Sequence, residues 1–230
     1  MKRQYQRASF KYNLLSNLSL VGWLILINII ASVIALILFA YGGIQYLALM
    51  PNNILHGKYL WTLLTHMFIH GGLFHLFINM FVLFSLGSLS ERIIGRKRFI
   101  WFYIISGLTA GILSVFLSGF FGSTELGARI FGSPDTYMVG SSGAIFAIAG
   151  LFVMLLPKIR FTIIFLPFFS LPAYIMVPLV LFATWAATIA GNFPIGNVAH
   201  LGGFLAGIIY GFYLRARYKK KVALLQRMFR

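Results

Sequence analysis

Residues 18–40 read LSLVGWLILINIIASVIALILFA, a run without any Asp, Glu, Lys or Arg. A helix needs about 20 apolar residues to cross the ~30 Å hydrocarbon core of a bilayer, and this run is long enough. It is also too long for the apolar core of a signal peptide, and no convincing cleavage site follows it. The run therefore predicts a first membrane-spanning helix.

The composition of the whole chain supports a membrane protein. Of its 230 residues, 60% are hydrophobic and 10% are charged, whereas an average soluble domain carries about 25% charged residues. The acidic residues are Glu91, Glu125 and Asp135 alone. The chain has no cysteine, which excludes disulfides, thiolate metal sites and cysteine nucleophiles.

Apolar stretches recur after the first one and predict five further spanning helices, at residues 73–89, 99–121, 142–156, 172–190 and 198–214. We therefore expect an all-α membrane protein in which residues 18–214 form a bundle of six transmembrane helices. Basic segments at residues 1–17 and 215–230 flank this membrane domain.

The positive charges sort the connections into two sides. The net charge is +16, and of the 19 Lys and Arg residues only Lys58 and Arg129 fall on the second side. Basic short loops stay in the cytoplasm, so we expect both termini to be cytoplasmic and the chain to lie in the cell membrane. Charges placed between apolar spans suit anionic membrane lipids, which argues against nucleic acid as the partner.

Two segments are expected at the membrane surface. Residues 41–72 lie outside in this topology but remain apolar and aromatic, with Tyr59, Trp61 and Phe68. Because Trp and Tyr are enriched at the interface, this first outer loop is expected to be embedded in the outer interface. The tail mixes Lys and Arg with apolar residues and predicts a helix resting on the inner membrane face.

Four polar residues in the spans indicate a functional site, because polar groups are costly there. They are His75, Asn79, Ser142 and His200, each within the first turns of a helix that runs from outside to inside. They therefore share one depth. At ~1.5 Å per residue, residues 142–156 span about 22 Å of the ~30 Å core, so Ser142 is expected at the floor of a wet recess below the outer surface.

The chemistry of these residues points to nucleophilic catalysis. A serine hydroxyl becomes a useful nucleophile when a nearby base takes its proton, and His200 is the one histidine in the C-terminal half of the chain. Gly140 and Gly143 flank Ser142, and Gly203 follows His200, so the helix backbones can approach closely. With no acid inside a span, we expect a Ser-His dyad.

An anionic tetrahedral intermediate would also need hydrogen-bond donors. The N-terminus of the helix at Ser142 offers backbone N–H groups and the positive end of its dipole. Asn79 and His75 lie four residues apart, hence on one helix face, and can donate as well.

Each signal also has a plainer interpretation when it is taken alone. A serine at a helix start is most often a cap, and a single histidine in a span more often packs or hydrogen-bonds than catalyses. His66 and His70 are four apart, but neither a cysteine nor a nearby acid accompanies them, and no His-Glu-x-x-His pattern occurs. We therefore expect no metal and no cofactor.

Three stretches resemble motifs of the rhomboid intramembrane serine proteases. Residues 140–146, GSSGAIF, resemble the Gly-x-Ser-Gly motif of that family, and residues 199–203, AHLGG, resemble its Ala-His-x-x-Gly motif. Residues 70–79, HGGLFHLFIN, are similar to its His-rich second helix, and Glu91 followed by Gly95 matches its cytoplasmic turn. The resemblance extends over residues 55–213.

The resemblance implies a role for each motif residue. Ser142, rather than Ser141, would be the nucleophile, a choice that spacing alone leaves open, and His200 would be the general base and later the acid. The resemblance assigns an oxyanion hole to the Ser142 backbone, His75 and Asn79. It assigns supporting contacts to Gly140, Gly143, Phe146 and Gly203. Phe146 would stack on the histidine.

The sequence departs from the family at one position. The family often has Arg directly after the tryptophan of its first loop, and this chain has Thr62 after Trp61. The departure concerns how the loop is anchored and leaves the dyad intact.

The resemblance implies an intramembrane serine endopeptidase whose substrates are transmembrane proteins with an unstable helix near the outer interface. The alternative is a catalytically silent membrane protein of the same fold that binds or escorts transmembrane clients. A small transporter or channel is disfavoured, because the chain shows neither a clear internal repeat nor an acid within a span.

Overall fold

The computed structural model describes residues 18–163, 166–191 and 195–229. The predicted N-terminal segment, residues 1–17, lies outside the described residues. Within them, five helical segments are long and apolar enough to cross a membrane: α1 (Leu20–Ala40), Leu73–Ile94, α6 (Arg96–Phe121), α9 (Ala173–Gly191) and α10 (Asn197–Arg217). A sixth apolar helix, α8 (Ser142–Leu155), is shorter. The prediction of an all-α membrane bundle is confirmed, although several helix ends differ by a few residues.

The second spanning segment consists of three parts. It starts as α4 (Leu73–Val82), passes through one π-helical stretch, η4 (Leu83–Gly87), and ends as α5 (Ser88–Ile94). Insertions of this kind widen a turn without breaking the helix, which lets the segment continue past its predicted end at residue 89. The last span also continues past the predicted domain boundary at residue 214, to Arg217.

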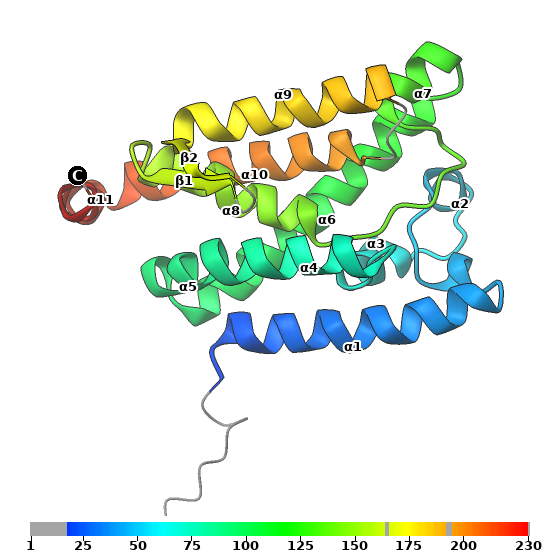
Figure 1. Ribbon diagram of the computed structural model, residues 1–230, viewed down its shortest axis with the longest axis horizontal. Helices are drawn as coiled ribbons and strands as arrows, with labels where there is room; N and C mark the ends of the chain where they lie inside the picture. The colour runs from blue at the N-terminus through cyan, green and yellow to red at the C-terminus, as the bar shows by residue number, and fades with distance from the viewer. Residues whose placement is uncertain (1–17, 164–165, 192–194, 230) are drawn as a thin grey trace, which may run out of the picture.

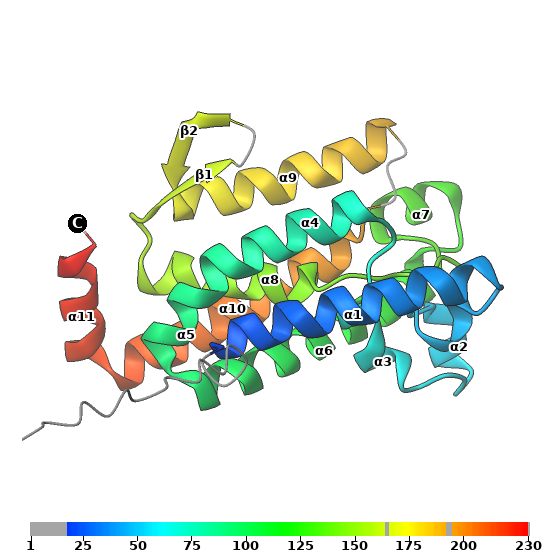
Figure 2. The ribbon, with the colours of Figure 1, turned by 60° about the horizontal axis from the view of Figure 1, so that its bottom comes forward.

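Helix α8 lies at the centre of the bundle. It packs most extensively against α10 and also contacts α6, α9 and η4. Both ribbon views place it between α4 and α10 (Figures 1 and 2). Most of its residues are buried, so this helix meets protein rather than lipid on nearly every side, which removes the need for it to match the full bilayer thickness.

Glycines allow α8 and α10 to touch along their backbones. A methyl group at Gly203 would overlap the carbonyl of Gly143, and one at Gly207 would overlap the carbonyl of Ala147. Gly203 and Gly207 are four residues apart, so they line one face of α10. Small residues at this spacing are how helices approach closely in membranes.

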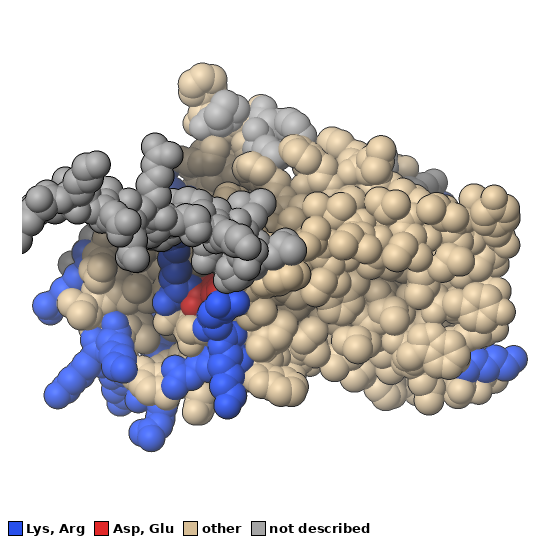
Figure 3. Space-filling model, turned by 90° about the horizontal axis from the view of Figure 1, so that it is seen from below, with Lys and Arg blue, Asp and Glu red and all other residues tan. Residues whose placement is uncertain are grey.

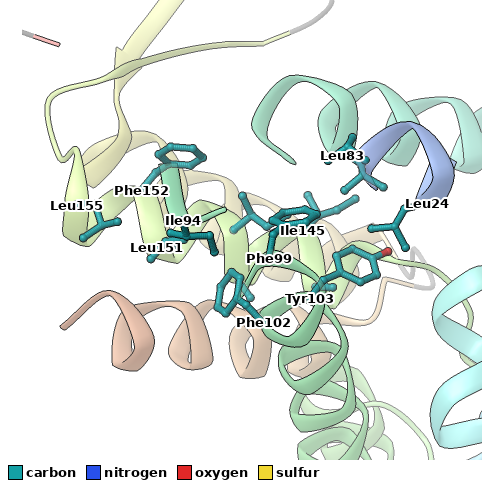
Figure 4. Packing of buried hydrophobic residues seen from close by; sticks show 14 of the residues in the cluster. Leu24, Leu83, Ile94, Phe99, Phe102, Tyr103, Ile145, Leu151, Phe152 and Leu155 are labelled. Atoms are coloured by element: carbon teal, nitrogen blue, oxygen red, sulfur yellow. The ribbon is translucent and has the colours of Figure 1, made fainter. Parts of the chain in front are cut away.

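Large apolar side chains fill the space between the helices (Figure 4). Phe99 and Tyr103 of α6 are fully buried, and Ile145 and Phe152 of α8 pack in the same cluster. Dense packing of this kind resists changes in side-chain volume. The cluster therefore fixes the height and rotation of α8.

The first outer loop forms short helices that lie against α6. They are η2 (Ile44–Tyr46), α2 (Pro51–Leu55), α3 (Thr62–Thr65) and η3 (His66–Phe68). Side chains of Leu55, His66 and Met67 occupy the spaces left by three glycines of α6, namely Gly119, Gly111 and Gly107. Trp61 is 55% exposed and donates its indole N–H to the carbonyl of Tyr46 (2.8 Å).

Thr62 anchors this loop at the position where the family that the sequence resembles often has arginine. Its side chain is fully buried, and its hydroxyl donates to the carbonyl of Tyr59 (2.8 Å). The Thr62 carbonyl lies 2.8 Å from Nδ1 of His66. The loop is thus held by a short polar side chain and a histidine in place of a long cation.

Two connections contain structure that was not predicted from the sequence. Helix α7 (Glu125–Phe131) follows α6, and a hairpin of β1 (Arg160–Ile163) and β2 (Leu166–Pro172) joins α8 to α9. The tail forms the expected helix, α11 (Lys219–Met228). It packs on the end of the bundle, where Val222 is buried and Gln226 donates to the carbonyl of Leu155 (3.0 Å).

The basic end of the bundle is organised around one buried acid. Seen from below, Lys and Arg gather at the end where α5 and α11 lie (Figure 3). There the Glu91 carboxylate accepts the backbone N–H groups of Leu20 and Val21 (both 3.0 Å) and lies 3.5 Å from Arg96. A negative charge at a helix N-terminus is stabilising, so Glu91 fixes α1 to the turn before α6.

Candidate active site

Ser142 is the first residue of α8, and its side chain does not cap the helix. The capping position belongs to Ser141, whose side chain makes no capping hydrogen bond. The Ser142 hydroxyl instead lies 2.9 Å from Nε2 of His200, 58 positions later in the chain. The hydroxyl is therefore engaged by an imidazole, the geometry that proton transfer requires.

His200 is held in place by the tight α8–α10 contact and by an aromatic ring. It lies in the first turn of α10 and is 8% exposed. Phe146, one turn after Ser142, stacks on the imidazole with ring centroids 4.4 Å apart and an interplanar angle of 23°. The stack fixes the plane of the ring so that Nε2 points at the hydroxyl.

No carboxylate extends this pair into a triad among the described residues. The Nδ1 atom of His200 has no hydrogen-bond partner there. Glu91 binds the start of α1, Glu125 pairs with Arg129, and Asp135 accepts from Asn52 (2.8 Å). The structure therefore brings Ser142 and His200 together as a pair, with no acidic third member among the described residues.

Gly140 keeps a space open beside the serine. Its φ angle is +123°, a conformation that residues with a side chain rarely adopt. A β-carbon there would lie 2.9 Å from Cε1 of His75 and 3.8 Å from Oγ of Ser142. The His75 ring and the Ser142 hydroxyl thus border one small volume that any larger residue at position 140 would fill.

Asn79 reaches the same turn from α4. Its Oδ1 accepts the hydroxyl of Ser141 (3.3 Å), and its Nδ2 donates to the carbonyl of His75 (2.9 Å). An amide nitrogen carries two N–H bonds, so one donor is left for a ligand. His75 and Asn79 therefore both approach the start of α8, as their spacing predicts.

A buried hydrogen-bond chain behind the serine was not predicted from the sequence. Nε2 of His70 lies 3.4 Å from the hydroxyl and 3.5 Å from the backbone nitrogen of Ser141. Nδ1 of His70 lies 3.0 Å from the hydroxyl of Ser32 in α1. Burial, with the neighbouring His75 as a smaller cause, lowers the pKa of His70 to about 3.

A signal for this chain was present in the sequence, because Ser32 is a polar residue within the first apolar span and His70 opens the His-rich motif. Apart from that motif, the sequence suggested for His70 only a metal pair with His66, which the absence of a cysteine or a nearby acid disfavours. In the structure both histidines are used in hydrogen bonds to the protein, and no group of three metal-binding side chains forms among the described residues.

The first outer loop also holds the segment that leads into α8. Leu49 and Met138 pair as an antiparallel bridge, with N–O distances of 3.0 and 2.7 Å. The carbonyl of His66 accepts the N–H of Gly140 (2.8 Å). These backbone bonds set the approach of residues 138–140, so the loop positions Ser142 from the side opposite α10.

Fold and site together define a multi-pass helical membrane protein with a serine–histidine pair at the start of a short central helix. The sequence model of the Rhomboid domain matches residues 57–217. The chain therefore belongs to the rhomboid family.

Rhomboid-like proteins from an animal and a plant are similar in sequence to this chain. The chain is 35% identical to "Presenilin-associated rhomboid-like protein, mitochondrial" of Homo sapiens over 146 residues, which cover 64% of this chain and 36% of that protein. It is 30% identical to "RHOMBOID-like protein 7" of Arabidopsis thaliana over 168 residues, which cover 73% and 47%. The chain spans less than half of the length of these relatives.

Proposed function

We propose that the chain is an intramembrane serine endopeptidase, with Ser142 as nucleophile and His200 as general base. The observation that carries the proposal is the 2.9 Å approach of the Ser142 hydroxyl to Nε2 of His200 at the outer end of the shortest apolar helix. Membership of the rhomboid family supports it.

In the first step, Oγ of Ser142 attacks the carbonyl carbon of the scissile peptide while Nε2 of His200 takes the hydroxyl proton. The carbonyl π bond becomes an oxyanion, and the histidine becomes an imidazolium. Phe146 stacks on that ring at 4.4 Å, where an aromatic face stabilises the developing positive charge.

The oxyanion is assigned to the space beside Gly140. The backbone N–H of Ser142 is free of intrahelical bonds because it begins α8. His75 borders the same volume, and Asn79 retains one N–H. Preorganised donors of this kind each contribute about 10²–10³ in rate.

In the second step, the tetrahedral intermediate collapses. The C–N bond breaks, and Nε2 of His200 gives its proton to the departing amine, leaving an ester on Ser142. Water then attacks the ester carbonyl and gives a proton to the same nitrogen. The C–O bond to Ser142 breaks as that nitrogen passes the proton to Oγ, which releases the carboxylic acid and the free serine. Protons and electrons balance, so no cofactor is required.

The depth of the serine defines the class of substrate in this proposal. Helix α8 has 14 residues, which span about 21 Å at ~1.5 Å per residue, so it leaves roughly 9 Å of a ~30 Å core uncovered. A transmembrane segment must unwind to present a peptide carbonyl there. Substrates are therefore transmembrane proteins with a weak helix near the outer interface.

The charge distribution supports the proposed orientation, with the basic end of the bundle cytoplasmic and the serine opening to the other side. Residues 18–214 would form the membrane domain, and residues 215–230 a cytoplasmic tail. The cell membrane is retained as the proposed location. Because the human relative carries the word mitochondrial in its name, fractionation of the tagged chain in its own cells is the direct test.

The function is tested with purified protein in liposomes that contain a transmembrane substrate. Wild type is expected to cut the substrate, and both Ser142→Ala and His200→Ala to abolish cutting. A fluorophosphonate is expected to label wild type and to leave Ser142→Ala unlabelled. Cleavage that survives either substitution would remove that residue from the proposed dyad.

The silent alternative gives a different result in the same assay. A client-binding protein would retain a transmembrane segment on the purified chain without cutting it, whatever residue stands at position 142. Binding without cleavage across several substrates, together with no fluorophosphonate labelling of wild type, would replace the protease proposal.

A further inference from the structure

The basic end of the bundle carries cations that no acid neutralises within the described part of the chain. Among the described residues the ion pairs are Arg96 with Glu91, at this end, and Arg129 with Glu125, in α7 at the opposite end. Lys97 and Arg98, at the start of α6, are exposed and have no carboxylate partner among the described residues. They are therefore available to an anion from outside the chain.

Tyr218 brings a third cation close to these two. The hydroxyl of Tyr218 accepts a hydrogen bond from Arg98 (3.3 Å), and the guanidinium carbon lies 5.4 Å from the centre of its ring. Nζ of Lys221 lies 5.8 Å from the same ring. One aromatic ring thus gathers two cations, a geometry that suits a phosphate, which guanidinium binds well.

An apolar groove begins beside these cations and runs along the periphery of the bundle, between α6 and α10. Its volume is about 760 Å³, with Lys97 and Arg98 at one end and Trp101, Ile105, Ala206 and Tyr213 along its walls. Trp and Tyr near the charged end are typical of side chains at the level of lipid headgroups.

The length of the groove matches one leaflet. From Lys97 to Thr109, its lining residues on α6 extend about 18 Å at ~1.5 Å per residue, and half of a ~30 Å hydrocarbon core is about 15 Å. We propose that the groove between α6 and α10 binds an anionic phospholipid, with its phosphate at Lys97 and Arg98 and an acyl chain along Trp101 and Ile105.

The occupant is a lipid rather than a nucleic acid or a free phosphate, because the cations continue into an apolar wall that an acyl chain would cover and those two ligands would not. The proposal concerns the face formed by α6 and α10 and does not depend on the protease activity. The headgroup carries a net negative charge in this proposal, because Lys97 and Arg98 border the groove and Lys221 lies near them.

The test uses the full chain in phosphatidylcholine vesicles that contain a small fraction of brominated phosphatidylglycerol or of brominated phosphatidylcholine. Bromine in the acyl chain quenches nearby tryptophan fluorescence, and comparison with Trp101→Phe isolates the contribution of Trp101. We expect phosphatidylglycerol to quench Trp101 at much lower mole fraction than phosphatidylcholine does.

A charge-matched pair of variants separates a site from a charged surface. Lys97→Gln with Arg98→Gln is expected to reduce the preference for phosphatidylglycerol roughly twentyfold to thirtyfold, about fivefold for each basic residue near the membrane. Lys219→Gln with Lys220→Gln removes the same charge at the same end but outside the groove. It is expected to change the preference by less than about threefold, because solvent screens these charges.

A third variant tests the groove itself. Ala206→Phe fills the groove and leaves every cation in place, so it is expected to remove the preference, with Ala206→Leu as a milder substitution if the first does not fold. Equal losses in the two charge variants, an unchanged preference in Ala206→Phe, or equal quenching of wild type by both lipids would each overturn the proposal. If neither brominated lipid quenched Trp101, another protein surface would occupy the groove, and the lipid proposal would be overturned as well.

Discussion

Ser141 and Ser142 are neighbours in the chain, but their side chains enter two different regions of the molecule. Ser142 points toward α10, where glycines bring two backbones together and His200 supplies one polar contact. Ser141 is fully buried and points toward the first outer loop and α4, where His70 and Asn79 hold its hydroxyl. The position of Ser142 thus depends on the close approach of two helix backbones, whereas the position of Ser141 depends on side-chain hydrogen bonds.

The region around Ser142 is arranged for chemistry in the proposed function, and the region around Ser141 for holding the helix start in position. The α10 side leaves its serine half-buried and paired with a base, so that side is suited to react. The loop side satisfies its buried polar groups with one another, which lowers the cost of burying them. Two identical residues thus have different surroundings, and the proposal gives them different roles.

The largest expected effect comes from removing each hydroxyl in turn. Ser142→Ala is expected to reduce cleavage of a transmembrane substrate in liposomes by at least about 10³-fold, because no nucleophile remains. Ser141→Ala is expected to retain activity within about tenfold and to lower the free energy of unfolding by about 1–3 kcal/mol, since it leaves partners of a buried hydrogen bond unpaired. The reverse pattern of activities would assign the nucleophile to position 141.

The second effect tests the glycine contact on the α10 side. Gly203→Ala adds a methyl group where the carbonyl of Gly143 lies, so the helices must move apart. We expect a loss of about 3 kcal/mol in stability and at least a hundredfold loss of cleavage, because even a small displacement of a catalytic pair costs about that much. The measurement is thermal unfolding in detergent beside the liposome assay.

Gly72→Ala is the matched control for this substitution. Gly72 has an extended φ angle of 170°, and a β-carbon there would meet no atom within 4 Å. The same change of side chain is therefore expected to leave the unfolding temperature nearly unaltered. If both glycine variants unfold at the same temperature, the close contact of α8 with α10 does not hold the bundle together.

The two sides also differ in how far the sequence predicted them. Six apolar stretches predicted the bundle, and glycines beside Ser142 and after His200 predicted a close helix contact. On the Ser141 side only Asn79 of α4 was expected near the site; His70, which comes from a loop, and its partner Ser32, which comes from α1, were missed. Hydrogen bonds between such distant segments follow no spacing rule, whereas glycines four residues apart on a helix do.

The connections were missed for a related reason. The hairpin of β1 and β2 follows a basic turn and carries apolar residues such as Phe168, which is fully exposed. Short apolar runs of this kind are ambiguous between strand and helix. Thr62 was read as a departure that puts the loop's usual polar anchoring in question, and in the structure its small hydroxyl anchors the turn locally through a backbone carbonyl.

The third effect is a pH dependence that belongs to the loop side. Burial lowers the pKa of His70 to about 3 and that of His66 to about 4, while an unfolded histidine has a pKa near 6.5. Below pH 6.5 the unfolded chain therefore binds more protons than the folded chain, so stability falls as the pH drops toward these values. Each histidine contributes a slope of up to about 1.4 kcal/mol per pH unit.

His70→Gln is expected to reduce this slope between pH 6 and pH 4, because glutamine keeps a polar side chain and does not titrate. Unfolding temperatures measured in detergent across that range provide the test. A slope equal to that of wild type would mean that His70 takes up a proton in the folded protein as readily as in the unfolded chain.

The smallest expected effect comes from the far end of the hydrogen-bond chain. Ser32→Ala removes the hydroxyl 3.0 Å from Nδ1 of His70 and leaves the dyad and its glycines untouched. Because a buried nitrogen of His70 then lacks its partner, we expect a loss of about 1–2 kcal/mol in unfolding free energy. Cleavage is expected to fall by less than about threefold, because His70 still contacts Ser141 and acts only through the turn before Ser142. A loss of cleavage as large as that of Gly203→Ala would show instead that hydrogen bonding on the loop side governs the reactive geometry as strongly as backbone packing does.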